Sequence, residues 1–123
     1  MYEIVVEQQI DAAHFLRGYQ GKCENVHGHR YIIRVRLKAR ILNEIGLAYD
    51  FTDIKRILKE ILNRYDHVLL NEIPPFDKIN PSAENIAGAV FQKLKERLAG
   101  EPVTIGAIEV WETPQQGVIY SPD

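Results

Sequence analysis

Three histidines stand where the sequence could bind a metal ion. His14 ends one segment of alternating polar and apolar residues, and His27 and His29 begin the next. Residues i and i+2 of a strand point the same way, about 6–7 Å apart. If the two segments form a hairpin, all three imidazoles meet at one end of one sheet face. Three neutral imidazoles suit zinc and leave a fourth position for water or substrate.

A simpler interpretation treats these histidines as three unrelated polar residues at strand ends. We favour the metal site because all three fall in register on the apolar faces of their segments. The ligand type would also accept a redox metal such as iron.

Cys23 is the only cysteine and lies between the two segments, four residues before His27. As a fourth ligand it would close the site and make a zinc ion structural. As a free thiol near a cation it would have a lowered pKa and could act as a base or nucleophile. The third alternative is an inert buried thiol, and the residues alone leave the three open.

Two acidic positions complete the candidate chemistry. The Asp66-His67 pair is either a histidine favoured by a helix C-terminus or a carboxylate-oriented imidazole that relays protons. Glu112 ends an apolar strand face, where it could cap a turn or accept a paired N–H edge from a ligand. Taken alone, each residue favours the structural alternative.

Alternation predicts the elements that carry the histidines. Strands are expected over 2–15 and 27–40 as an antiparallel pair, and a closing strand pair over 103–112 and 117–120 around the turn "TPQQ". The first two strands would carry opposite charges on their outer faces. These rows are Glu3, Glu7 and Asp11 on the first strand and Arg30, Arg34, Arg36, Lys38 and Arg40 on the second.

A change of period predicts two helices between the strand pairs. The first spans 51–65, with Asp50 or Thr52 as its cap, and the second spans about 83–99 and stops at Gly100. The order β-β-α-α-β-β indicates one α+β domain over 1–123, with two helices on one face of an antiparallel sheet. Four strands leave two sheet edges, so we expect a homo-oligomer that pairs them.

Composition narrows the classes of partner. The chain is 46% hydrophobic and 26% charged, as in ordinary globular proteins, and its net charge of −2 argues against nucleic acid or anionic membrane as partner. The basic row alone would suggest a nucleic-acid binder, but the acidic row opposes this. The N-terminus does not look like a signal peptide, and no apolar stretch approaches the roughly 20 residues of a membrane span, so we expect a cytoplasmic protein.

Several motifs together resemble the 6-pyruvoyltetrahydropterin synthase / 6-carboxytetrahydropterin synthase family. They are "AAHFL", "KCENVHGHRY", "AYDFTDIK", "YDHVLLNE", "NPSAENIA" and "WETPQQGVIY", and they span almost the whole chain. The resemblance implies the tunnelling fold (T-fold), in which subunits join sheet edges into a barrel and two trimers stack into a hexamer. The basic row would then line the barrel interior.

The resemblance also implies roles at the metal. His14, His27 and His29 would bind Zn²⁺, which holds the hydroxyls of the substrate side chain and acidifies the adjacent C–H. Cys23 would be the base that removes the proton. The substrate implied is 7,8-dihydroneopterin triphosphate.

Further roles follow from the same resemblance. Asp66 and His67 would relay protons from a neighbouring subunit, and Glu112, followed by Thr113, would anchor the pterin ring.

The Cys-x3-His-Gly-His spacing matches members that make 6-carboxy-5,6,7,8-tetrahydropterin for queuosine-type deazapurines. Members that make the pyruvoyl product typically have Cys-x5-His-Gly-His.

Glu24 also fits a second activity, that of the folate-linked group of the family. A folate-linked group of the family replaces the cysteine with a glutamate near this position, and this chain has both, as Cys23-Glu24. We therefore expect a 6-carboxytetrahydropterin synthase, with folate-branch formation of 6-hydroxymethyl-7,8-dihydropterin, or both activities, as the alternative. A solvated loop charge at Glu24 and a non-catalytic zinc- or pterin-binding oligomer are the remaining alternatives.

Overall fold

The computed structural model describes residues 1–21 and 24–123. Cys23 lies outside the described residues, so its predicted role as base stays a prediction. Among the described residues, no helix is long and apolar enough to cross a membrane.

Two long strands form the centre of the structure. β1 (Tyr2–His14) and β2 (His27–Ala39) pair antiparallel along their whole length, so that His14 lies opposite His27. This pair follows from the alternation of the sequence, which only Gln8 interrupts in β1, and confirms the predicted hairpin within one residue at each end. The register puts the metal-binding candidates at one end of the sheet.

The closing strand pair is also confirmed, with small shifts. β4 (Thr104–Thr113) pairs with β2, and β5 (Gln116–Tyr120) pairs with β4. Only Pro114 and Gln115 lie in the turn, so both strands run further into "TPQQ" than expected.

A fifth strand was not predicted. β3 (Val68–Leu69) pairs parallel with Ala12 and Ala13 of β1, which gives the order β3-β1-β2-β4-β5. The expectation of four strands in a purely antiparallel sheet is therefore wrong in this detail. Two residues are too few to show an alternating pattern. β3 covers only one end of the β1 edge.

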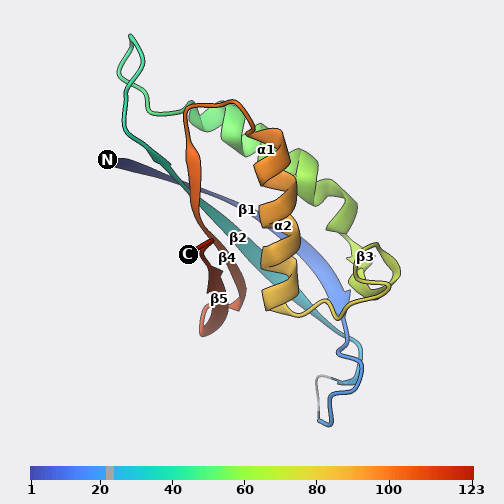
Figure 1. Ribbon diagram of the computed structural model, residues 1–123. Coiled ribbons are helices and arrows are strands. Elements are labelled where there is room, and N and C mark those ends of the chain that lie inside the picture. The colour runs from blue at the N-terminus through green and yellow to red at the C-terminus, as the bar shows by residue number, and fades with distance from the viewer. Residues whose placement is uncertain (22–23) are drawn as a thin grey trace.

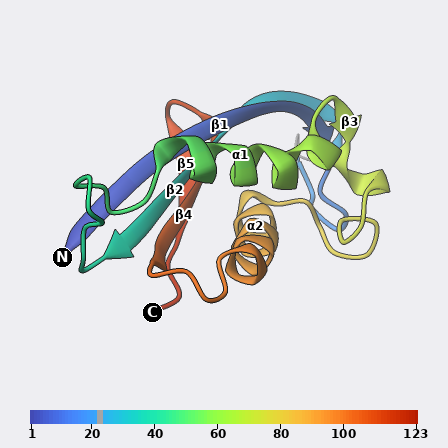
Figure 2. The same ribbon diagram turned by 90° about the horizontal axis from the view of Figure 1, so that it is seen from above.

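Both helices lie on the same face of the twisted sheet, as Figures 1 and 2 show. α1 (Phe51–Leu62) is capped by Asp50, whose side chain accepts from the Thr52 amide, and α2 (Ala83–Arg97) is capped by Ser82. α1 ends three residues earlier than predicted, because the chain tightens into a 3₁₀ turn, Asn63–Tyr65.

The two sheet faces have opposite character. The face under the helices is apolar, and its buried residues include Ile33, Val35, Ile108 and Val110 from the strands and Ile54, Leu58, Ile86 and Leu94 from the helices. The other face carries the predicted charge rows. Three cross-strand ion pairs are present there, Arg30–Asp11, Arg34–Glu7 and Arg36–Glu3.

Candidate active site

The three histidines converge as predicted. His14 and His27 are direct cross-strand partners, and their Nε2 atoms are 3.1 Å apart. His29 lies two residues along β2 on the same face, with its ring centroid 5.2 Å from that of His14 and 4.9 Å from that of His27. One nitrogen from each ring lies within 4.8 Å of the others. This cluster, the histidine triad, could hold a metal ion.

Backbone carbonyls orient two members of the triad. His14 Nδ1 is 2.7 Å from the Pro81 oxygen, and His27 Nδ1 is 2.7 Å from the Asn25 oxygen. A carbonyl oxygen only accepts, so each Nδ1 carries a proton and each Nε2 presents a lone pair. Metal-binding histidines are commonly oriented through their second nitrogen in this way.

Burial also favours the metal-binding form of two members of the triad. Desolvation lowers the pKa of His14 and of His29 below the ordinary value, which favours neutral imidazole. The Nε2 atom of His29 is buried, and it has no hydrogen-bond partner within the described part of the chain. Three imidazoles whose ring nitrogens converge in this way fit a zinc ion.

Glu112 lies beside the triad. One of its carboxylate oxygens is 3.6 Å from His14 Nε2 and 3.9 Å from His29 Nε2, and the other accepts from Gln116 Nε2 at 2.8 Å. The register of β2 with β4 ends at the pair Ile32–Trp111, and the register of β4 with β5 shifts between Trp111 and Thr113, so Glu112 lies at an irregular strand end beside the histidines. Thr113 follows, and its hydroxyl accepts from the Gln115 amide at 3.1 Å within the turn.

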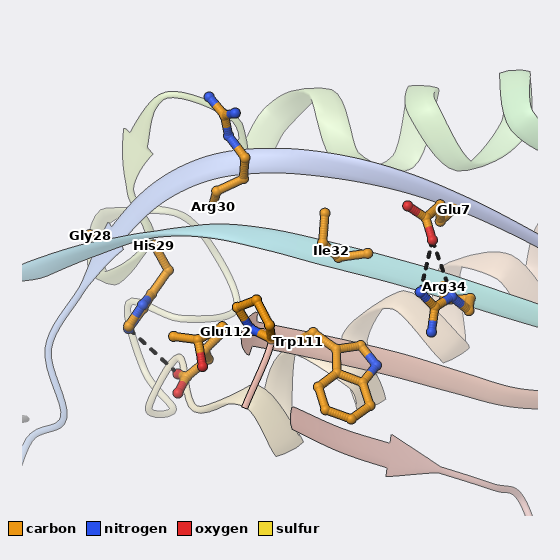
Figure 3. A pocket seen from close by; sticks show the side chains of 10 residues that line it. Glu7, Gly28, His29, Arg30, Ile32, Arg34, Trp111 and Glu112 are labelled. Atoms are coloured by element: carbon orange, nitrogen blue, oxygen red, sulfur yellow. Dashed lines mark hydrogen bonds and ion pairs between the residues drawn. The ribbon is translucent and has the colours of Figure 1, made fainter. Parts of the chain in front are cut away.

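A cavity of about 700 Å³ opens next to this carboxylate. Figure 3 shows its lining, with His29 pointing toward Glu112 at one end and the Arg34–Glu7 pair at the other. Thr113 and the Trp111 indole also line it. The cavity is large enough for a small heterocyclic ligand and has both acidic and basic groups on its walls.

Asp66 and His67 form a separate group at the edge of β1. Asp66 Oδ1 accepts from the Asp11 amide at 2.9 Å and lies 3.0 Å from His67 Nδ1. The Asp11 amide is the main cause that lowers the pKa of Asp66. His67 has a positive φ of 58°, and its side chain is 76% exposed, so within one chain it does not join the triad.

Glu24 is exposed, and among the described residues it lines neither the cavity beside Glu112 nor the two smaller cavities that His14 and His29 line. Its backbone amide donates to the Gly21 oxygen at 3.1 Å. In this chain alone, its position fits a solvated loop charge.

Sequence reasoning missed a buried carboxylate on the outer face. Glu109 is 1% exposed, and its oxygens accept from Arg34 Nη1 at 2.9 Å, Arg36 Nε at 2.6 Å and Trp111 Nε1 at 2.9 Å. We call these four residues the Glu109 cluster. Strand parity gives the signal that could have found it, because Glu109 shares the face of Trp111 and lies opposite Arg34 in the register.

Comparison with solved structures identifies the fold. The structure of Caenorhabditis elegans 6-pyruvoyl tetrahydropterin synthase superposes with a TM-score of 0.83 at 28% identity, covering 100% of this chain and 98% of that one. The Plasmodium falciparum 6-pyruvoyl tetrahydropterin synthase superposes with a TM-score of 0.77 at 22% identity, covering 97% and 96%. The fold is the tunnelling fold of these enzymes.

Sequence comparison identifies the family. The profile described as 6-pyruvoyl tetrahydropterin synthase matches residues 3–123. The chain is 33% identical to a 6-carboxy-5,6,7,8-tetrahydropterin synthase of Haemophilus influenzae, covering 93% of this chain and 94% of the relative. It is 36% identical to the Synechocystis protein of the same name, covering 98% and 93%. The chain therefore belongs to the 6-pyruvoyl tetrahydropterin synthase family of lyases.

Proposed function

We propose that this chain is a zinc-dependent 6-carboxy-5,6,7,8-tetrahydropterin synthase that acts on 7,8-dihydroneopterin triphosphate. The observation that carries the proposal is the histidine triad, in which backbone carbonyls fix the tautomers of His14 and His27, and the buried His29 Nε2 has no partner in the described part of the chain. Relatives that bear the name of this activity cover nearly the whole chain.

The residues of the triad would hold the zinc ion through His14, His27 and His29. When bound, the ion supplies a positive charge that orients the hydroxyls of the substrate side chain and makes the adjacent C–H more acidic. Cys23 is the candidate base for that proton, because it precedes His27 by only four residues.

Glu112 and the pair Asp66–His67 have complementary tasks in this proposal. The Glu112 carboxylate accepts N–H donors from the pterin ring, since it lies at the rim of the large cavity and beside the triad. Thr113 lines the same cavity.

Asp66 stays ionised and accepts from His67 Nδ1, so the Nε2 atom of the exposed imidazole remains free to exchange a proton.

The oligomer belongs to the same proposal. His67 faces outward, so it would serve the triad of a neighbouring subunit. β5 and most of β1 lie at the two edges of the sheet, and joining such edges between subunits would close a barrel. A hexamer of two stacked trimers is the assembly we propose, and sedimentation of the purified protein measures its mass.

Product analysis tests the function. Zinc-loaded protein is incubated with 7,8-dihydroneopterin triphosphate, and the products are identified by mass spectrometry. We expect 6-carboxy-5,6,7,8-tetrahydropterin together with acetaldehyde and inorganic triphosphate. An absence of turnover by zinc-loaded, folded protein would favour a non-catalytic pterin- or zinc-binding role.

The folate-branch activity is the second candidate, because Glu24 stands next to Cys23. Its product is 6-hydroxymethyl-7,8-dihydropterin, which the same assay separates by mass. Replacing Cys23 by Ala should lower formation of the carboxy product about 10²–10⁴-fold, as expected for loss of a positioned base. Replacing Glu24 by Ala should leave it unchanged, and the reverse pattern would move the assignment to the folate branch.

A pyruvoyl product is the third outcome of the assay. The chain is 31% identical to a 6-pyruvoyl tetrahydrobiopterin synthase of Dictyostelium discoideum, covering 81% of this chain and 73% of the relative. The Cys-x3-His-Gly-His spacing favours the carboxy product instead.

A further inference from the structure

Beyond the end of β1, two asparagine side chains form the hydrogen bonds that a neighbouring strand would otherwise form. The Asn71 amide accepts from the Phe15 N–H at 3.0 Å and donates to the Phe15 oxygen at 3.0 Å. The Asn80 amide repeats this pairing at Arg17, with distances of 2.9 Å and 3.0 Å. Each side chain thus satisfies both backbone groups of one residue, as a neighbouring strand would.

The Arg17 guanidinium also holds this segment, through three backbone oxygens. It donates to the oxygen of Phe76 at 2.8 Å and to the oxygens of Ile79 and Asn71 at 3.3 Å each. A planar guanidinium can bridge several acceptors with little loss of conformational freedom. These contacts therefore connect residues 71–80 to Phe15 and Arg17, which follow the end of β1.

The next residue along this segment is Pro81, whose oxygen fixes His14. Asn80 is held on both sides, because its own carbonyl accepts from Asn85 Nδ2 at 2.8 Å, at the start of α2. The Pro81 carbonyl follows directly and lies 2.7 Å from His14 Nδ1. Its position against the imidazole thus depends on the contacts of Arg17 and Asn80.

That carbonyl decides between two arrangements of the imidazoles. The Nε2 atoms of His14 and His27 are 3.1 Å apart, which is hydrogen-bond distance. If His14 carried its proton on Nε2, it would donate to His27 and fill the space between the two rings. The Pro81 acceptor keeps the proton on Nδ1, so both lone pairs stay available for a metal ion.

We propose that Arg17, Asn71 and Asn80, which we call the asparagine–arginine clasp, are positioning residues of the metal centre. The clasp holds the Pro81 carbonyl where it selects the Nδ1–H tautomer of His14. This inference rests on the proposed function only in taking the triad as a zinc site, and it can be tested without substrate.

The test compares Arg17→Met with a matched control, Arg97→Met. Arg97 also uses its guanidinium to join two elements, through Glu60 of α1, but lies at the far end of α2 from the triad. The tautomer of His14 in metal-free protein is read from its ring ¹⁵N chemical shifts at pH 8, and zinc affinity is read by competition with a chromogenic chelator.

Wild type and Arg97→Met should show the Nδ1–H tautomer and equal zinc affinity. Arg17→Met should show a mixture of tautomers and bind zinc at least about tenfold more weakly, within the range usual for residues that orient metal ligands. Unchanged tautomer and affinity in Arg17→Met would overturn the proposal.

A second variant covers the case in which Arg17→Met does not fold, as judged by circular dichroism. Asn80→Ala keeps the guanidinium contacts of Arg17 and removes only the amide pairing, so the same mixture of tautomers is expected. Wild-type shifts in Asn80→Ala would then overturn the proposal. If wild-type protein binds no zinc, the proposed function fails, whereas the tautomer comparison still decides the role of the clasp.

Discussion

The Glu109 cluster and the histidine triad are both built from buried polar groups, but they differ in how those groups are paired. Each carboxylate oxygen of Glu109 accepts at least one hydrogen bond, from an arginine guanidinium or from the Trp111 indole. In the triad, two Nε2 lone pairs face each other at 3.1 Å, and His29 Nε2 has no partner among the described residues. The polar groups of the cluster pair with one another, whereas those of the triad form an arrangement that could hold a metal ion.

This difference separates a structural network from a functional site. Buried polar groups in folded proteins are nearly always hydrogen-bonded, and an exception calls for a physical explanation. The Glu109 cluster stabilises the outer face by satisfying its charges. The described residues offer no hydrogen-bond donor to His29 Nε2, and a cation bound by the triad would supply the missing partner.

Removal of a triad histidine should give the largest effect. His27→Ala leaves two ligands, so we expect zinc affinity to fall more than about a hundredfold and turnover to fall to background. Without metal, His27→Ala should unfold at the same temperature as the wild type or at a slightly higher one, because it lacks the nitrogen lone pair that faces His14. Zinc titration and thermal unfolding measure the two effects. If His27→Ala bound zinc as tightly as the wild type, the triad would not be the metal site.

Breaking the Glu109 cluster should show the opposite pattern. Glu109→Gln replaces a charged acceptor with an amide whose NH₂ group faces an arginine, so the free energy of unfolding should fall by about 1–3 kcal/mol. Zinc affinity should stay at the wild-type value, because the cluster makes no contact with the triad. Urea unfolding of metal-free protein is the measurement. A large loss of zinc binding without loss of stability would contradict the comparison.

The two regions should also respond to acid in different pH ranges. Burial lowers the pKa of His14 and His29 from 6.5, so below about that pH the unfolded chain binds more protons, and the free energy of unfolding falls as the pH drops. Burial tends to raise the pKa of Glu109, but the donors Trp111, Arg36 and Arg34 outweigh it and lower the pKa from 4.5. Its contribution is therefore present above that pH and lost as the pH falls through the lowered value.

Denaturant unfolding of metal-free protein between pH 7 and pH 3 resolves these two ranges. His14→Gln should flatten the dependence between pH 7 and pH 5 and leave the acid range unchanged. A stability that is constant from pH 7 to pH 5 in the wild type would contradict the effect of burial on the triad.

The smallest effect is expected from a matched change of another carboxylate on the same outer face of the sheet. Glu3→Gln alters a carboxylate that also pairs with Arg36, at 3.0 Å, but both side chains are more than one-third exposed. Exposed ion pairs contribute little to stability because water screens them. Urea unfolding should therefore separate this variant from Glu109→Gln, and equal losses would show that burial is not the deciding factor.

Local patterns predicted the elements that hold the site. Alternation predicted β1 and β2 within one residue at each end, and the same parity put His14, His27 and His29 on one face. β3 and the early end of α1 were missed, because two residues carry no periodic signal and a 3₁₀ turn continues the apolar spacing of a helix. Glu109 was missed because its meaning depends on which residue lies across the strand pair.

The sequence by itself determined which residues could bind a metal, because ligand type and strand parity are local properties. It also determined the family, since its motifs span nearly the whole chain. Only the tertiary structure decided which lone pairs are available. The carbonyl of Pro81, 67 residues from His14, contacts Nδ1 of that imidazole, and the end of β4 places Glu112 beside the triad. Such contacts depend on loop placement and register between distant segments, which no local pattern encodes.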